Sequence, residues 1–600
     1  MDMDDDACYR ALSTRDARFD GRLFVAVKTT GIYCRPICPA RTPKRENVRF
    51  YPTAAAAQSA GFRPCLRCRP ETSPDLGAWR GASNTVARAL SLIEAGALDD
   101  NDVEGLAGRL GVGERQLRRL FHKHLGASPV AVAQTRRVLL AKQLIHETRL
   151  PMAEVAMASG FGSVRRFNET FQTLYDRPPG ALRRLGGADE TASHGEAVLV
   201  TLPYQAPYDW DAILAFLAMR AIPKVERVAD GRYERSLGIG GAVGVIRVEP
   251  ASKHRIAVSV RFPKISALPA IIARVRRVFD LAADPVAISQ HLAQDPALAP
   301  LVARRPGLRV PGAWDGFELA IRAILGQQIT VVAARGLAAK LVSAYGEPLP
   351  DNLASEGVSH VFPTPQRLVG ADFAALGMPK SRAAALSAMT DAVAADPLIF
   401  GPKRTLEEAV AALRALPGIG EWTAQYIAMR ELREPDAFPA ADIGLMRALA
   451  DETGKRPPPA ELLARAEAWR PWRAYAALHL WSSEAPATQS KELSDDRDAA
   501  RGPHPRNPPD PDRPDPGRRR RSGPSVRSRV LERRGGDAQT AATPLRVGEG
   551  GVRQGCCVAA RRVRSLLRRR RRGADECAVA HRRHRVPAKR LESADHHPGR

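Results

Sequence analysis

The sequence has no run of apolar residues long enough to cross a membrane. Its 600 residues are 44% hydrophobic, yet no uninterrupted stretch approaches the roughly 18 apolar residues that a membrane-spanning helix requires. The first six residues, Met-Asp-Met-Asp-Asp-Asp, also lack the positive charge with which a secretory signal begins. These absences predict a protein that has no membrane partner and works in the cytoplasm.

Cysteine is scarce, with eight residues in the whole chain. So few cysteines in a reducing compartment argue against a framework of disulfides. Four of them nevertheless form two close pairs, Cys34-Arg-Pro-Ile-Cys38 and Cys65-Leu-Arg-Cys68, separated by 26 residues. This spacing suits four thiolate ligands around one zinc ion. The spacing alone leaves open whether the zinc only stabilises a small domain or also takes part in chemistry.

Acidic residues are in short supply, since 65 Asp and Glu face 91 Lys and Arg, which gives a net charge of +26. Residues 491–600 hold 29 Lys and Arg against 14 Asp and Glu, a surplus of 15, so the remainder is only mildly basic. Within that remainder, residues 21–70 carry ten Lys and Arg and a single acid, Glu46. This local charge predicts a polyanionic partner such as the phosphate backbone of double-stranded DNA.

Composition and periodicity divide the chain into five segments of a multidomain protein. They are a small α+β domain with the paired cysteines (1–80), an all-α domain (81–190), a second α+β domain (197–305), a second all-α domain (306–485) and a tail (486–600). The α+β assignments depend on β-like runs at 23–27 and 256–262, and the all-α assignments on helical periodicity.

The tail from 486 onward is rich in Pro, Arg, Gly and Asp and poor in residues that form a core. This composition predicts disorder, although an abrupt change of this kind is also compatible with a shifted reading frame. Cys556, Cys557 and Cys577 lie here without metal-ligand spacing. We assign no function to the tail.

Two segments have the helix, glycine-centred turn and second helix of a DNA-reading unit, at 103–121 and 152–175. Side chains on the second helix of each unit are candidates for contacts with bases and phosphates. They are Arg115, Gln116, Arg118, Arg119, Ser163, Arg165, Arg166 and Asn168. A solvated helix face or a nonspecific phosphate contact remains an alternative for each of them.

A glycine turn, Leu416-Pro-Gly418-Ile-Gly420, precedes another helical stretch. Its glycines allow close backbone approach, and free amides at the start of the next helix can bind a DNA phosphate. An ordinary tight turn between helices is the alternative. Asp442 follows about twenty residues later, before a helix, where its ordinary role is that of an N-cap.

The cysteine-containing segment resembles the Ada N-terminal domain over nearly its whole length, in the stretches 24–36, 45–50 and 60–65. The resemblance implies that Cys34, zinc-bound with Cys38, Cys65 and Cys68, accepts a methyl group from a DNA methyl phosphotriester. Zinc would hold the thiol as a nucleophilic thiolate. Methylation would change the charge of the site from about −2 to about −1, which should strengthen DNA binding. The transfer should be stoichiometric, because a thioether does not readily return its methyl group.

The two helix–turn–helix units, joined by a helix around 130–147 and followed by the stretch 177–183, resemble the AraC-type DNA-binding domain. With the Ada-type segment, this resemblance implies a transcriptional activator that binds promoter DNA and contacts RNA polymerase.

Most of 197–483 resembles the AlkA-type helix-hairpin-helix DNA glycosylases, in the stretches 207–210, 323–327, 362–365, 416–426, 436–445, 469–475 and 478–481. The resemblance implies hydrolysis of the N-glycosidic bond of alkylated purines of the 3-methyladenine type, without a cofactor. It assigns the catalytic carboxylate to Asp442 and the pocket for a flipped, cationic base to Trp422, Tyr426 and Trp481. Core packing is the alternative for each aromatic residue. Trp422 stands where bifunctional relatives have a Schiff-base lysine, which implies that cleavage stops at an abasic site.

The sequence departs from this family at the residue that enters the DNA. The family has an apolar wedge after the Leu-Gly-Gln loop, whereas this chain has Gln328. A polar side chain can still enter a minor groove, but substrate discrimination should differ.

Three functions are compatible with this organisation. The chain could combine regulator and glycosylase, could be a transcriptional regulator with a non-catalytic glycosylase-like half, or could be a glycosylase with a decayed regulator. The intact cysteine set argues against the third function, and Asp442 with the hairpin argues against the second.

Overall fold

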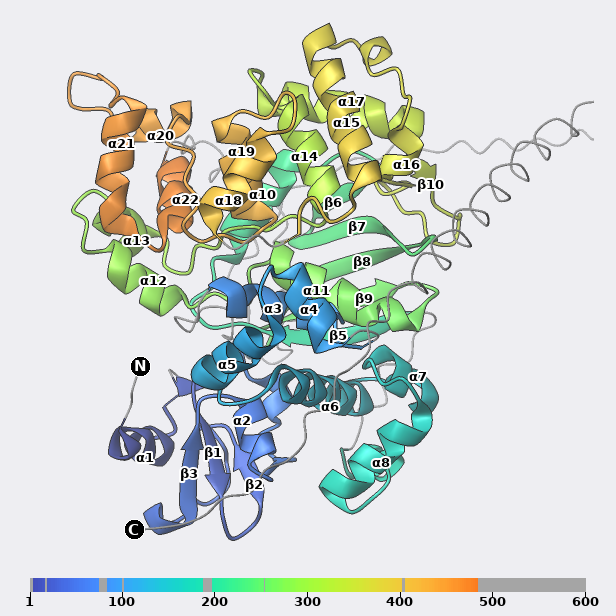
Figure 1. Ribbon diagram of the computed structural model, residues 1–600, viewed down its shortest axis with the longest axis vertical. Coiled ribbons are helices and arrows are strands. Elements are labelled where there is room, and N and C mark those ends of the chain that lie inside the picture. Colours follow the sequence, from blue (N-terminus) through green and yellow to red (C-terminus); the bar gives the residue numbers. More distant parts are fainter. Residues whose placement is uncertain are drawn as a thin grey trace, which may run out of the picture. The chain divides into compact units, whose positions relative to one another are not determined.

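The computed structural model describes residues 4–16, 19–74, 84–99, 102–186, 197–252, 254–401 and 405–483 (Figure 1). The predicted tail, including Cys556, Cys557 and Cys577, lies outside the described residues. Among the helices that are described, none is long and apolar enough to span a membrane.

The cysteine-containing segment forms a four-stranded sheet with strand order β3-β1-β2-β4. Its elements are α1 (Asp5–Ser13), β1 (Phe24–Val27), β2 (Ile32–Cys34), β3 (Val48–Tyr51), α2 (Ala54–Ser59) and β4 (Arg63–Pro64). Side chains alternate across β1, since Val25 packs with Leu12 of α1 while Ala26 packs with Ala57 of α2. Both faces of the sheet are therefore covered, and the predicted α+β fold is confirmed.

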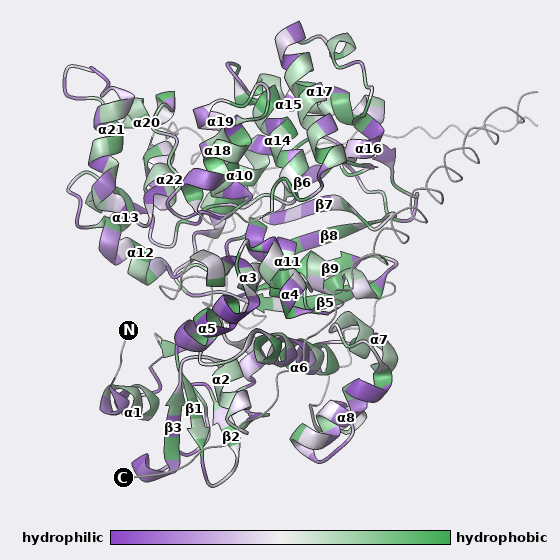
Figure 2. Cartoon of the chain, in the orientation of Figure 1, coloured by the Kyte–Doolittle hydropathy of each residue, from purple (hydrophilic) through white to green (hydrophobic). Residues whose placement is uncertain are grey.

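The second segment is all-helical, as predicted. It contains α3 (Asn84–Glu94), α4 (Val103–Arg109), α5 (Glu114–Leu125), α6 (Pro129–Glu147), α7 (Met152–Ala158), α8 (Val164–Tyr175) and α9 (Pro179–Gly186). The second helix of each DNA-reading unit buries one stripe and exposes the other, because its apolar residues recur every four positions. The buried residues are Leu117, Phe121 and Leu125 in α5 and Phe167, Phe171 and Tyr175 in α8. Figure 2 shows the hydrophilic side of α5.

The third segment is a five-stranded antiparallel sheet with helices. Its strand order is β5-β9-β8-β7-β6. The elements are β5 (Val198–Pro203), α10 (Trp210–Arg220), β6 (Glu226–Ala229), β7 (Arg232–Ile239), β8 (Ala242–Ala251), β9 (Arg255–Arg261), α11 (Leu268–Val278), α12 (Pro285–Leu292) and α13 (Ala299–Arg304). Helix α10 begins at Asp209, whose side chain accepts from the Ala212 amide at 2.9 Å.

The fourth segment is helical apart from the two-residue strands β10 (Glu347–Pro348) and β11 (His360–Val361). Its helices are α14 (Gly316–Leu325), α15 (Val331–Tyr345), α16 (Pro365–Leu368), α17 (Lys380–Ala395), α18 (Leu406–Arg414), α19 (Glu421–Arg430), α20 (Ile443–Ala448), α21 (Pro459–Ala466) and α22 (Arg473–Ser483). Helix α14 is buried on all sides and packs against α17 and α19. A helix that is apolar on every face is expected at the centre of a core.

Candidate active sites and DNA interfaces

The four paired cysteines come together in the first segment. Parallel pairing of β2 with β4 sets Tyr33 opposite Pro64, which places Cys34 and Cys65 side by side at the strand ends. The sulfur atoms of these two residues, Cys38 and Cys68 all lie within 4.8 Å of one another. Tetrahedral zinc with Zn–S bonds of about 2.3 Å needs sulfurs roughly 3.8 Å apart. The cluster therefore fits one zinc ion held by four cysteines.

Main-chain amides donate hydrogen bonds to two of the four sulfurs. The main-chain amides of Arg35 and Arg67 donate to Sγ of Cys68 and Cys65, each at 3.3 Å. Hydrogen bonds among the four thiols act in opposite directions, since the one with Cys34 lowers the pKa of Cys65 and the one with Cys38 raises the pKa of Cys34. Amide donors of this kind stabilise thiolates and orient them toward a metal.

Cys34 differs from the other three cysteines in its exposure. Cys38, Cys65 and Cys68 are buried, whereas Cys34 is partly exposed. Five cations of the basic stretch are also exposed, namely Lys28, Arg41, Lys44, Arg49 and Arg67. The residue Cys34 is thus partly open to an external anionic substrate, although it is buried, like the other three, where the four sulfurs cluster.

The helix–turn–helix candidates all lie on the exposed sides of their helices. Each of Arg115, Gln116, Arg118, Arg119, Ser163, Arg165, Arg166 and Asn168 is exposed. Three of them have local roles as well. Ser163 caps α8 by accepting from the Arg166 amide at 3.2 Å, and Arg118 and Arg165 pair with Glu114 and Glu169 one turn away. Such exposed pairs are weak, so these arginines remain available to a phosphate.

The two hairpin glycines differ in their surroundings. Gly418 has φ +79°, and a Cβ there would lie 2.3 Å from Cβ of Ala385. Gly420 caps α19 with ordinary φ −83°, and a Cβ there would meet nothing within 4 Å. No side chain caps the first turn of α19. Gly418 is thus required by internal packing, whereas the open space at Gly420 leaves the α19 amides accessible to an external anion.

The loop that carries Gln328 is fastened to this hairpin. The side-chain amide of Gln327 donates to the Gly418 carbonyl at 2.9 Å and to Thr423 Oγ1 at 3.3 Å. The Arg382 guanidinium donates to the main-chain carbonyl of Gln327 at 2.5 Å. Gln328 is exposed and has φ +57°, a backbone conformation that non-glycine residues rarely adopt. No local pattern indicates the role of Gln327, because Gly418 and Thr423 lie 91 and 96 residues further along the chain.

Asp442 accepts hydrogen bonds from three donors. Its Oδ1 accepts from the Leu445 amide at 3.0 Å and from Trp481 Nε1 at 2.8 Å. Its Oδ2 accepts from Trp422 Nε1 at 2.7 Å. The carboxylate is therefore an N-cap of α20 and is also held in one orientation by two indoles from distant helices.

The aromatic candidates surround this carboxylate. The rings of Trp422 and Tyr426 stack with centroids 5.1 Å apart and planes at 10°. Both residues and Trp481 are only partly buried, which leaves surface open to a ligand. Partial exposure of three large rings around one carboxylate suits a flat, electron-poor ligand.

Phe216, Arg220 and Arg430 complete this group, although the sequence analysis did not identify them. Arg430 donates to the Tyr426 hydroxyl at 2.7 Å, and the guanidinium carbon of Arg220 lies 3.8 Å from the Phe216 ring centroid. Burial alone would raise the pKa of the Tyr426 hydroxyl, but the charges of Arg430 and Arg220 outweigh burial and hold it below its usual value. The sequence shows only that Phe216 and Arg220 lie one helical turn apart. It does not reveal that Arg430 and Tyr426 of the distant helix α19 lie next to them.

Four family models match the chain in order. They are the metal binding domain of Ada (residues 7–71), a helix-turn-helix domain (106–185), the AlkA N-terminal domain (199–315) and the HhH-GPD superfamily of base excision DNA repair proteins (321–474).

Three curated proteins illustrate the similarity. The probable bifunctional transcriptional activator/DNA repair enzyme AlkA of Mycobacterium tuberculosis is 43% identical over 493 residues, which cover 82% of this chain and 98% of that protein. DNA-3-methyladenine glycosylase 2 of Escherichia coli is 39% identical over 290 residues, 48% of this chain and 98% of that protein. Bifunctional transcriptional activator/DNA repair enzyme Ada of Escherichia coli is 39% identical over 133 residues, 22% of this chain and 36% of that protein.

Proposed function

The chain belongs to the family of bifunctional transcriptional activators and DNA repair enzymes that join an Ada-type metal-binding domain and an AraC-type helix-turn-helix domain to an AlkA-type glycosylase, and we propose that it excises 3-methyladenine-type purines and senses methyl phosphotriesters through Cys34. The observation that carries the first activity is the Asp442 carboxylate, held by two tryptophan indoles beside stacked aromatic rings.

Excision begins with recognition of the flipped base. Hairpin amides at Gly418 and Gly420 bind a phosphate, and Gln328 enters the space that the nucleotide leaves. Trp422, Tyr426 and Trp481 then bind the base, whose positive charge is attracted to their electron-rich faces. Fastening of the Gln328 loop to the hairpin by Gln327 supports this arrangement, because phosphate binding and insertion then share one rigid unit.

Cleavage of the C1′–N bond depends on the positive charge of the base and the negative charge of Asp442. As the C1′–N bond breaks, its electron pair moves to the cationic base, which leaves neutral, and positive charge develops on the sugar. The fixed Asp442 carboxylate stabilises that charge. Water then adds to C1′ and loses a proton, which leaves an abasic site. The alternative of a non-catalytic glycosylase-like half gives no reason for both indoles to orient one carboxylate.

Methyl transfer uses the thiolate of Cys34. Zinc, when bound by Cys34, Cys38, Cys65 and Cys68, keeps the sulfurs deprotonated at neutral pH. Cys34 Sγ attacks the methyl carbon of the triester, a carbon–sulfur bond forms, the carbon–oxygen bond breaks, and its electron pair stays on the phosphate oxygen. Each chain accepts one methyl group, because the thioether is stable.

The methylated state then acts in transcription. Loss of one negative charge beside the exposed cations strengthens DNA binding. The candidate residues on α5 and α8 contact promoter DNA, and the bound activator contacts RNA polymerase.

The glycosylase proposal predicts the effect of Asp442→Asn. Asparagine retains much of the capping capacity, so stability should change by less than about 1 kcal/mol. It removes the negative charge opposite the sugar, so single-turnover release of 3-methyladenine should fall by about 100-fold or more.

Asp102→Asn is the matched control, because Asp102 caps α4 in the same way, accepting from the Gly105 amide at 2.8 Å. Its base release should equal that of the unaltered protein. Near-normal release by Asp442→Asn would show that Asp442 is only a cap.

A further inference from the structure

We propose that the zinc site is shared between two domains, because Lys142 of the helix-turn-helix domain positions the loop that carries the zinc ligand Cys65. Zinc binding should then also order the two DNA-reading helices, α5 and α8. The inference goes beyond the proposed function and rests on neither of the two proposed reactions. The observation that motivates it is a fully buried lysine whose ammonium group contacts the main chain of a zinc ligand.

Lys142 lies on α6, the helix between the two helix–turn–helix units. Its Nζ donates to the Cys65 carbonyl and to Glu71 Oε2, each at 2.7 Å. The side chain of Glu71 is also buried and accepts a second hydrogen bond from Arg69 Nε at 3.0 Å. Burial of an ammonium group is costly unless the group is paired and hydrogen-bonded. These two contacts therefore hold the Lys142 ammonium against the loop.

Cys65 is held at three of its atoms. Its main-chain amide donates to the Tyr33 carbonyl at 3.0 Å, its Sγ accepts from the Arg67 amide at 3.3 Å, and its carbonyl accepts from Lys142. The first two contacts lie within the Ada-type domain, whereas the third comes from the helix-turn-helix domain. Groups that hold a metal ligand from outside the coordination sphere change metal affinity by about 10–100-fold. Lys142 is therefore a positioning residue of the zinc site.

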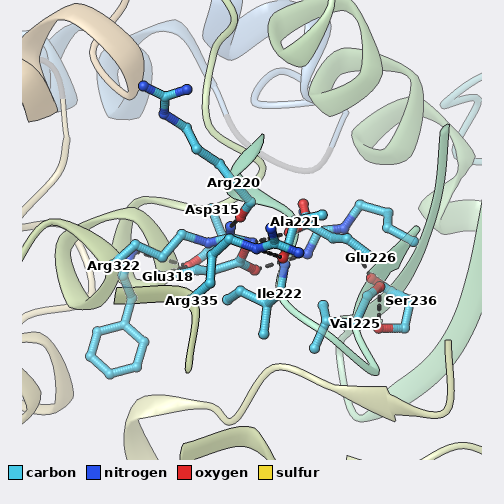
Figure 3. A network of polar contacts seen from close by, with 12 residues as sticks. Arg220, Ala221, Ile222, Val225, Glu226, Ser236, Asp315, Glu318, Arg322 and Arg335 are labelled. Atoms are coloured by element: carbon cyan, nitrogen blue, oxygen red, sulfur yellow. Dashed lines mark hydrogen bonds and ion pairs between the residues drawn. The ribbon is translucent and has the colours of Figure 1, made fainter. Parts of the chain in front are cut away.

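The chain uses the same kind of contact within the glycosylase half (Figure 3). There Arg322 of α14 donates to the Arg220 carbonyl at the end of α10, at 2.8 Å. It also pairs with Glu226 and Glu318, each at 2.5 Å. A cation that binds both carboxylates and a distant carbonyl thus fastens one element to another. Lys142 follows this pattern, with the difference that its carbonyl belongs to a zinc ligand.

The Ada-type domain also contacts the ends of both DNA-reading helices. Thr53 Oγ1 donates at 2.7 Å to the carbonyl of Leu125, the last residue of α5. The guanidinium carbon of Arg63 lies 5.8 Å from the ring centroid of Tyr175, the last residue of α8. Arg63 belongs to β4, which leads directly into Cys65. A change in the loop at Cys65 therefore reaches α6 and α8 through direct contacts.

The coupling between zinc and α6 acts in both directions. If the contact with Lys142 tightens zinc binding, zinc binding stabilises the packing of α6 by the same factor, because both effects belong to one thermodynamic cycle. Loss of zinc should therefore loosen α6, which joins the two helix–turn–helix units. Zinc occupancy then affects DNA reading independently of the methylation of Cys34.

The first test replaces both members of the buried pair, in Lys142→Met/Glu71→Met. Exchange of a buried ion pair for apolar side chains is often neutral for stability, and Arg69 keeps Glu147 as a partner at 3.1 Å. The Cys65 carbonyl, however, loses its donor. Competition with a chelator on the full chain should show a zinc dissociation constant raised by about 10-fold or more, while circular dichroism shows unchanged helicity.

Arg137→Met is the matched control, because Arg137 lies on the same helix but pairs with Asp99 of the second segment, at 2.8 Å. Its zinc affinity should equal that of the unaltered protein. An unchanged zinc affinity in the folded Lys142→Met/Glu71→Met protein, or an equal fall in Arg137→Met, overturns the inference.

Hydrogen–deuterium exchange of the unaltered protein gives a second test that needs no variant. Removal of zinc under reducing conditions should speed amide exchange in residues 138–147 of α6 by about 10-fold and leave exchange in α14 unchanged. Exchange in α6 that does not respond to zinc also overturns the inference. Neither measurement involves methyl transfer or base release, so failure of the proposed function is distinguished from failure of this inference.

Discussion

At the scale of single residues, the proposed methyl acceptor is one of four cysteines that share a single cluster. Exposure to DNA carrying methyl phosphotriesters should place one methyl group on Cys34 and none on Cys38, Cys65 or Cys68, because Cys34 is the one residue of the four that is partly exposed. Peptide mass mapping measures this directly. Removal of zinc with a chelator should abolish the transfer, since the thiolate then protonates. A methyl group on any of the buried cysteines contradicts the assignment.

His479 in α22 predicts a loss of stability in mild acid. It is 4% exposed, and burial, reinforced by the charge of Arg305, lowers its pKa from 6.5 to about 4. The unfolded chain takes up a proton below pH 6.5 while the folded chain stays neutral until about pH 4. This histidine therefore costs about 2–3 kcal/mol of stability as pH falls from 7 to 4.5.

His479→Gln should remove that part of the pH dependence. Six of the seven tryptophans lie within 197–483, so unfolding followed by tryptophan fluorescence reports on this half of the chain. The difference in unfolding free energy between the two proteins should shift by about 2–3 kcal/mol in favour of the variant from pH 7 to 4.5. A constant difference would mean that His479 titrates normally in the folded state.

Residue chemistry was predictable from sequence where ligands or donors recur at short spacing. The C-x3-C and C-x2-C pairs pointed to a metal cluster, and the structure brings their sulfurs together. The contacts of Phe216 with Arg430 and of Gln327 with Gly418 were not predictable, because each depends on packing between segments far apart in sequence. A local sequence pattern contains no information on contacts between residues that are far apart along the chain.

At the scale of elements, the hairpin between α18 and α19 contains two glycines with different roles. Gly418 is required by packing, whereas Gly420 leaves space for a phosphate. Gly418→Ala should destabilise the protein by about 2–4 kcal/mol, because it strains a positive φ and drives a methyl group into Ala385. Gly420→Ala should lower stability by about 0.5–1 kcal/mol, because alanine is a poorer N-cap residue than glycine, and should weaken DNA binding by about 10-fold, because its methyl group enters the space open to phosphate.

Tryptophan fluorescence measures the stability of both variants, and fluorescence anisotropy with a labelled duplex measures their affinity. If Gly420→Ala binds DNA as tightly as the unaltered protein, the α19 amides do not contact a phosphate, and the glycines form only a turn.

Element types followed from periodicity with few exceptions. The β-like runs at 23–27 and 256–262 correspond to β1 and β9, and the helical periodicity of 81–190 corresponds to the run of helices from α3 to α9. The parallel pairing of β2 with β4 had no sequence signal, because each strand is only two or three residues long. That pairing is nevertheless what brings Cys34 to Cys65.

At the scale of the whole molecule, the order of four family domains along one chain joins damage sensing to damage removal. The sequence motifs were sufficient to predict this multidomain fold class, because each domain has its own short signature. The grouping of side chains around Asp442 was not predictable, since its members come from α10, α19 and α22 and from the start of α20.

The most direct test of the account follows both reactions in one sample of the full chain mixed with methylated DNA. The account predicts release of free 3-methyladenine over many turnovers, together with a single methyl group per chain on Cys34. It also predicts that Asp442→Asn abolishes only the first reaction and Cys34→Ser only the second. Methylation of Cys34 without base release, or base release that persists in Asp442→Asn, would contradict the central claim.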